Sequence, residues 1–180
     1  RLSVDYFEKM HIIKNRKEDE VAIMLIQFNF KNFRSFREEV TLDLSATKMT
    51  EFSERVVTIG SEKILPIAAI YGANASGKSN IYSAFEYMAE YVVDSFKYGD
   101  EEEKFEEYRP TPFLFDSTSA DAESSFEVYF TIPGDKNERT YNYGFCVDQE
   151  GVTEEWLNSK AKTARKYSTV SVSYTHLRAH

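Results

Sequence analysis

The sequence has a single cysteine, Cys146, so no disulfide bond can form within the chain. Its three histidines, at positions 11, 176 and 180, are scattered and have no cysteine partners at the spacing of a zinc site. No apolar run reaches the roughly 18 residues that a membrane-spanning helix needs, and the N-terminus has no signal-peptide pattern. These absences favour a cytoplasmic protein with no structural metal and no membrane partner.

The sequence also lacks an excess of positive charge. It carries 22 Lys and Arg against 30 Asp and Glu, a net charge of -8, which argues against a uniformly basic nucleic-acid-binding surface. The densest basic group lies at 160–166, and a short run of this kind is usually a solvated segment. The sequence therefore leaves open whether DNA is a partner. With 42% hydrophobic residues in 180, the chain is typical of one folded globular domain.

Three segments can be separated along the chain. Residues 1–23 are polar with weak periodicity, and we interpret them either as translated upstream sequence before a natural start at Met24 or as a genuine N-terminal arm. Residues 24–166 carry the folded pattern. The end of the chain resembles translated sequencing-adapter read-through, so 167–180 is expected to be an artefactual tail.

The folded segment predicts strands on both sides of a long helix. Alternating apolar residues predict strands at 24–30 and 40–44, a hairpin at 126–132 and 141–147, and a further strand around 152–157. The nearly continuous apolar run 64–71 predicts a strand covered on both faces. The acidic stretch 100–107 predicts a surface connection.

From Lys78 onward, apolar residues recur at helical spacing and predict a helix of about five turns that packs on the sheet. The apolar stripe of this helix consists of Ile81, Phe85, Met88, Ala89, Val92 and Phe96.

Between the apolar run and this helix lies the pattern GxxxxGKS, which in this chain reads Gly72, Ala73, Asn74, Ala75, Ser76, Gly77, Lys78 and Ser79. Glycines without a Cβ let the backbone curl so that its amides surround phosphate oxygens, and the helix adds its positive end. The Lys78 ammonium can reach the β- and γ-phosphates, and the Ser79 hydroxyl can bind Mg²⁺. The pattern therefore predicts a nucleoside triphosphate site.

The sequence offers no second acidic site for hydrolysis. Asp148 follows an apolar stretch, but the alternation before it suits a strand with one buried face, so we reject it as the magnesium ligand. No catalytic residue is therefore assigned within the chain. An Asn-Lys-x-Asp stretch for guanine is absent, which favours ATP and disfavours a GTPase, and no acceptor site for a kinase is visible.

The order of Phe30 to Phe36 (FKNFRSF) and then the phosphate loop followed by Asn80 resembles AAA family ATP-binding proteins with an ABC-type ATPase head, as in RecF, SMC and OLD proteins. This resemblance implies an α/β fold of the P-loop NTPase class: an ABC-like first lobe with a mixed sheet and an antiparallel β meander. It also adds Asn80 to the nucleotide-binding set. For Arg34 it leaves two interpretations open: a residue near the bound phosphates, or an exposed arginine at the end of a strand.

The resemblance further implies a homodimer of heads that sandwich ATP and Mg²⁺, with hydrolysis in the complete protein and roles in DNA repair or anti-phage defence. The signature loop and acidic pair of the family are absent, so we expect a truncated N-terminal lobe with little activity alone. The alternative is a DNA-associated binding module in which ATP is a dimerisation switch with little turnover.

Overall fold

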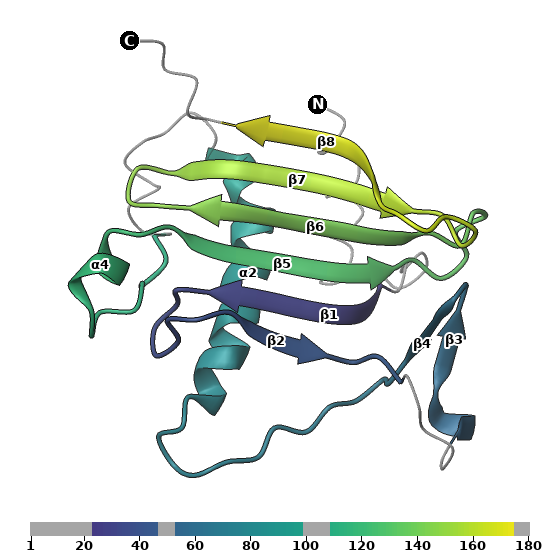
Figure 1. Ribbon diagram of the computed structural model, residues 1–180, viewed down its shortest axis with the longest axis horizontal. Coiled ribbons are helices and arrows are strands. Elements are labelled where there is room, and N and C mark those ends of the chain that lie inside the picture. The colour runs from purple at the N-terminus through teal and green to yellow at the C-terminus, as the bar shows by residue number, and fades with distance from the viewer. Residues whose placement is uncertain (1–22, 47–52, 99–108, 175–180) are drawn as a thin grey trace.

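The computed structural model describes residues 23–46, 53–98 and 109–174, apart from the side chains of 94–98. Its main feature is a six-stranded sheet with the strand order β2-β1-β5-β6-β7-β8 (Figure 1). Every pair in this sheet is antiparallel. The strands are β1 (Met24–Lys31), β2 (Val40–Asp43), β5 (Ser124–Thr131), β6 (Thr140–Val147), β7 (Val152–Lys160) and β8 (Ser168–Tyr174).

The strands predicted before the phosphate loop at 24–30 and 40–44, and after α2 at 126–132, 141–147 and 152–157, are confirmed. The two N-terminal strands pair with each other, with Phe28 opposite Leu42. The hairpin of β5 and β6 places Phe126 opposite Phe145, and β7 continues the meander. Apolar residues on alternate positions give each strand one face that packs inward, which is why the period-2 pattern located these strands well.

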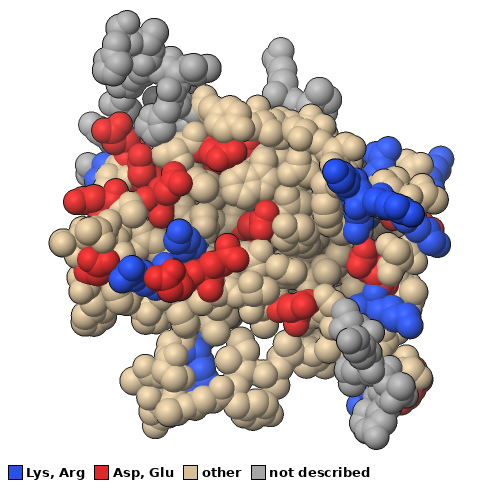
Figure 2. Space-filling view, in the orientation of Figure 1, with Lys and Arg blue, Asp and Glu red and all other residues tan. Residues whose placement is uncertain are grey.

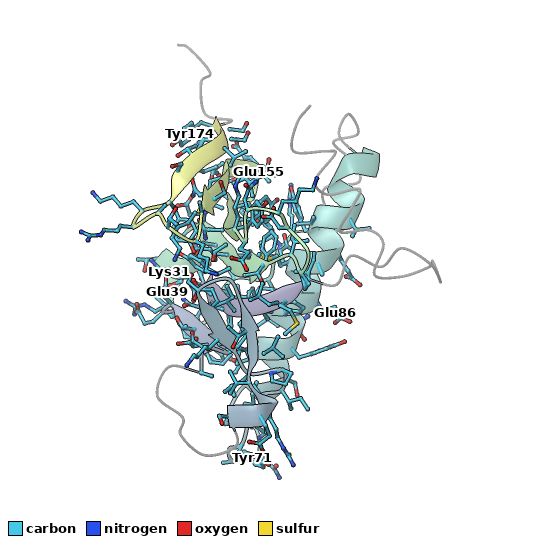
Figure 3. The ribbon with its side chains drawn as sticks, turned by 90° about the vertical axis from the view of Figure 1, so that its right-hand side faces the viewer. Lys31, Glu39, Tyr71, Glu86, Glu155 and Tyr174 are labelled. Carbon is cyan, nitrogen blue, oxygen red and sulfur yellow. The ribbon has the colours of Figure 1, made fainter. Side chains whose placement is uncertain are left out.

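The helix α2 (Lys78–Tyr98) crosses one face of the sheet and buries it (Figures 1 and 3). Ala84, Met88 and Val92 are its buried apolar residues, and they share one core with the inward side chains of β1, β5 and β6. Aromatic rings dominate that core; the Phe126 ring lies 4.8 Å from that of Tyr87 and 5.5 Å from that of Phe145, measured between centroids. A long amphipathic helix is thus held by one packed face.

The predicted apolar stripe of α2 is only partly correct. Met88 and Val92 are buried and Ile81 packs against the core, but Ala89 is exposed and Phe85 is 39% exposed. The buried stripe runs instead through Ala84, with Tyr87 and Tyr91 beside it. Phe96 lies outside the described side chains. A helix can rotate by part of a turn and still bury an apolar face, so the sequence pattern left this angle open.

The strand predicted over 64–71 is wrong. Only Ile64 belongs to a strand, as the last residue of β4 (Glu62–Ile64), which pairs with β3 (Val57–Ile59). Beyond the hydrogen bond from the Leu65 amide to the Leu44 carbonyl (2.8 Å), the chain is irregular and exposed. Ile67 and Tyr71 are 80% and 91% exposed, and Tyr71 lies at the lower end of the molecule in Figure 3.

The reason for this error is that an apolar run can be covered on both faces only if other elements flank it. In the described part of the chain no strand runs beside 65–71, and Pro66 has no N–H to donate to a neighbour. The mixed sheet expected from the sequence is accordingly wrong for the described residues, where every strand pair is antiparallel.

The face of the sheet opposite α2 carries a ladder of side-chain hydrogen bonds across four strands. Glu127 on β5 accepts from the amide nitrogens of Asn29 on β1 (2.9 Å) and Asn142 on β6 (2.8 Å). Asn158 on β7 donates to the Asn142 side-chain oxygen (3.0 Å). Acidic side chains spread over the left half of this face in Figure 2. The ladder satisfies polar groups that the strands partly bury.

Two short elements complete the described chain: the 3-10 turn η2 (Ser53–Arg55) and the helix α4 (Ser117–Ala120). The predicted connection at 100–107 lies outside the described residues, as do 1–22. Strand β8 falls within the predicted tail 167–180. The division of the chain at 23 and 166 stays a prediction.

Candidate functional site

The loop between the exposed segment and α2 is tightly curled. Ala75 and Gly77 both have positive φ, 62° and 90°, on either side of Ser76. The Ser76 amide turns back to the Ala73 carbonyl (3.3 Å), and a Cβ added at Gly72 would lie 2.9 Å from the Ser76 hydroxyl oxygen. Alternating signs of φ aim successive N–H groups into one concavity, which is the geometry of an anion-binding nest.

Lys78, the first residue of α2, closes this loop. Its ammonium group donates to the carbonyls of Gly72 (2.8 Å) and Ala73 (2.6 Å), so the side chain lies across the loop. An ammonium group has three N–H donors, and these two bonds leave one for another acceptor. The lysine thus fixes the start of the loop to the helix and still presents a positive charge.

The first turn of α2 adds further donors. The amides at the start of a helix have no partner within it, and the aligned peptide dipoles make this end positive. The first turn of α2 contains no acidic residue that would repel an anion. Ser79 is exposed there, so its hydroxyl is open to a metal ion or a phosphate oxygen. All nine residues assigned from the sequence, from Gly72 to Asn80, therefore lie in the loop and the first helical turn.

A tight turn between β1 and β2 forms a second side of the site. A Cβ added at Gly77 would lie 2.9 Å from both the Ser35 hydroxyl oxygen and the Phe36 ring, so the turn touches the loop. The Asn80 side-chain amide donates to the Ser35 oxygen at 2.8 Å. Arg34 is the neighbouring exposed residue, with its guanidinium 5.2 Å from the centroid of the Phe33 ring. The FRSF segment and the phosphate loop are thus neighbours in space.

Buried contacts hold this turn in place. Phe33 and Phe36 exchange backbone hydrogen bonds of 2.8 and 2.9 Å, and Phe33 is 2% exposed in the core. The preceding residue, Asn32, is also buried; its side-chain nitrogen donates to the carbonyls of Ser119 (2.8 Å) and Ala122 (2.9 Å). The sequence did not indicate that Asn32 would be buried and hold the turn, because an asparagine is ordinarily found in exposed turns.

The other reactive groups of the described chain do not join the loop. The Asp148 carboxylate accepts from the amides of Glu150 (2.8 Å) and Gly151 (3.0 Å) in the turn after the antiparallel strand β6, and its rejection as a magnesium ligand stays a prediction. Burial, followed by the charge of Glu123, raises the pKa of the Cys146 thiol to about 12, so the cysteine is protonated at neutral pH. Within the described residues, no group of three or more His, Cys, Asp or Glu side chains could hold a metal ion.

Residues 67–173, more than half of the chain, match the family model described as "AAA domain, putative AbiEii toxin, Type IV TA system". The chain belongs to this AAA domain family. The matched range contains the phosphate loop, α2 and the strands from β5 onward, whereas β1, β2 and the turn with Ser35 lie outside it. Membership implies the P-loop NTPase fold and nucleotide binding.

No curated protein matches this AAA domain significantly. None of the helices in its described residues is both long enough and apolar enough to cross a membrane. Ser35 and Phe36 contact the loop although they lie outside the family match. Both belong to the FRSF segment noted in the sequence. Their contact with Gly77 and Asn80 could not be predicted from the sequence, because it forms only in the folded chain.

Proposed function

We propose that this AAA domain binds ATP with Mg²⁺ and is the nucleotide-binding lobe of an ABC-type ATPase head. The observation that carries the proposal is the curled loop 72–77 with the Lys78 ammonium group lying across its carbonyls. Backbone amides and one ammonium charge converge there, which is the arrangement that a polyphosphate requires. ATP is preferred over GTP because the sequence has no guanine-recognition segment.

In this proposal each part of the loop has a separate role. The amides of loop 72–77 and those of Lys78 and Ser79 at the start of α2 hold the phosphate oxygens, and the Lys78 ammonium group neutralises charge on the β- and γ-phosphates. The Ser79 hydroxyl supplies one oxygen to a magnesium ion, whose other ligands are phosphate oxygens and water. We further propose that Arg34, which precedes the two residues that touch Gly77, adds a second positive charge beside the phosphates.

Hydrolysis requires groups that the described residues do not bring to the loop. We propose that they come from a further lobe of the same head and from a second head in an ATP-dependent homodimer. The exposure of the apolar segment 65–71 next to the loop supports a covering element there, since burial of exposed apolar side chains lowers the free energy of the protein. Roles in DNA repair or anti-phage defence are proposed on the family resemblance alone.

Titration of the chain with fluorescent mant-ATP and Mg²⁺ tests the proposal, with Lys78→Ala as the variant. We expect Lys78→Ala to weaken binding by about 10-fold or more, the effect of a charge-assisted hydrogen bond. Lys136→Ala is the matched control, because Lys136 is an exposed lysine on the β5–β6 turn. Equal affinity of wild type and Lys78→Ala would refute the phosphate site.

Two further measurements test the magnesium site and separate an ATPase from an ATP-dependent switch. Ser79→Ala is expected to reduce the gain in affinity that Mg²⁺ provides while leaving metal-free binding unchanged. Phosphate release and light scattering of the full-length protein with Mg²⁺ and ATP then distinguish an ATPase from a switch. Dimerisation without turnover would favour the DNA-associated module over the ATPase.

A further inference from the structure

The hydrogen bond between Asn80 and Ser35 joins two segments that are 45 residues apart in the sequence. On one side is the first turn of α2, directly after the phosphate loop, and on the other is the tight turn between β1 and β2. Ser35 and the Phe36 ring also lie against Gly77. The contact therefore links the sheet to the one part of the loop where φ is +90°.

The two partners differ in how firmly they are held. The turn is fixed to the core by the buried Phe33 ring, by the Phe36 ring on that of Phe30 (5.3 Å between centroids), and by the hydrogen bond from the Arg34 amide to the Thr111 carbonyl (2.8 Å). The loop is entered from residues 66–71, which make no backbone hydrogen bond to the other described residues. Its position relative to the sheet thus rests on α2 and on this contact.

This geometry also decides what the Asn80 amide does. Its nitrogen donates one hydrogen bond to the Ser35 hydroxyl oxygen at 2.8 Å, although the family resemblance assigns Asn80 to the nucleotide. The Asn80 backbone amide is engaged as well, by the Gly77 carbonyl at 2.9 Å. The backbone amide has no second hydrogen to give to phosphate, and the side-chain nitrogen keeps one N–H beyond its bond to the turn.

We propose that Asn80 and Ser35 are positioning residues for ATP binding: their hydrogen bond holds the loop at Gly77 in the curled form that accepts phosphate. The inference rests on the proposed function of the loop. A loop that is already ordered loses less conformational entropy when the nucleotide binds, so loss of the link weakens binding.

The experiment is a double-mutant cycle on the full chain, with mant-ATP and Mg²⁺ as the probe. Ser35→Ala and Asn80→Ala are each expected to weaken binding about 3- to 10-fold, the worth of one neutral hydrogen bond. The double variant should be no weaker than either single variant, because both remove the same bond. Ser35→Thr keeps the hydroxyl and should restore most of the affinity.

Ser61→Ala is the matched control, since Ser61 is exposed and its hydroxyl donates to the carboxylate of the adjacent Glu62 (3.0 Å). Unfolding in urea is measured for every variant. A fall in unfolding free energy with unchanged affinity would show a purely structural link and overturn the inference. Additive losses in the double variant would also overturn it.

Lys78→Ala distinguishes failure of the inference from failure of the proposed function. If Lys78→Ala loses affinity while the Ser35 and Asn80 variants bind as wild type, the inference fails and the phosphate site stands. If Lys78→Ala binds as wild type, the proposed function fails, and the inference fails with it.

Discussion

Gly77 allows a quantitative test of how the loop is built. The substitution Gly77→Ala adds a Cβ to a residue with φ +90°, which costs an L-residue roughly 1–2 kcal/mol. The added Cβ also lies 2.9 Å from the Ser35 hydroxyl oxygen and from the Phe36 ring. Relieving contacts this short costs about 1–3 kcal/mol, because the Phe36 ring cannot move away without losing its contact with Phe30.

The expected loss of unfolding free energy is therefore about 2–5 kcal/mol, measured by urea denaturation at neutral pH. Gly134→Ala is a control that isolates one of the two contributions. Gly134 has a nearly equal φ of +84°, but a Cβ there would meet no atom within 4 Å. We expect about 1–2 kcal/mol for this control. The entropy lost by the unfolded chain when glycine becomes alanine is common to both variants and cancels in their difference.

The difference between the two variants thus measures the contact between the loop and the turn. ATP binding should fall in Gly77→Ala and stay unchanged in Gly134→Ala. If Gly77→Ala is no more destabilising than Gly134→Ala, the loop does not pack on Ser35 and Phe36 as described, and the reasoning on this side of the site is refuted.

Three other predictions concern the framework of the site. Asn32→Ala should lower the unfolding free energy by about 1–3 kcal/mol in urea, because it removes the hydrogen bonds that this buried side chain donates to the carbonyls of Ser119 and Ala122; an unchanged midpoint would contradict this. Tyr87→Phe should leave stability unchanged or raise it by up to about 1 kcal/mol in thermal unfolding, since the buried Tyr87 hydroxyl has no hydrogen-bond partner in the described structure. The Thr118 hydroxyl, followed by the Thr118 amide, lowers the pKa of Asp116, so its carboxylate stabilises the fold above its unfolded pKa, and this contribution disappears as pH falls through the folded value. The difference in unfolding free energy between wild type and Asp116→Asn should accordingly be constant near neutral pH and shrink below about pH 4; a difference that persists in acid would refute it.

The sequence by itself determined the local chemistry of this protein. The spacing of Gly72, Gly77 and Lys78 was sufficient to predict the phosphate loop and the helix after it, because curling and helix initiation depend on neighbouring residues. The alternation of apolar and polar residues located β1, β5, β6 and β7, since the residues of each strand themselves show which face is buried.

Tertiary structure alone decided which segments meet. The run 64–71 had the composition of a strand covered on both faces, yet burial depends on partner elements, and the described chain places none beside it. In the same way, no local pattern showed that Ser35 would bond to Asn80 or that Asn32 would anchor the turn beside the loop. Such contacts join residues 45 and 87 positions apart, so they form only when the folded chain brings distant segments together.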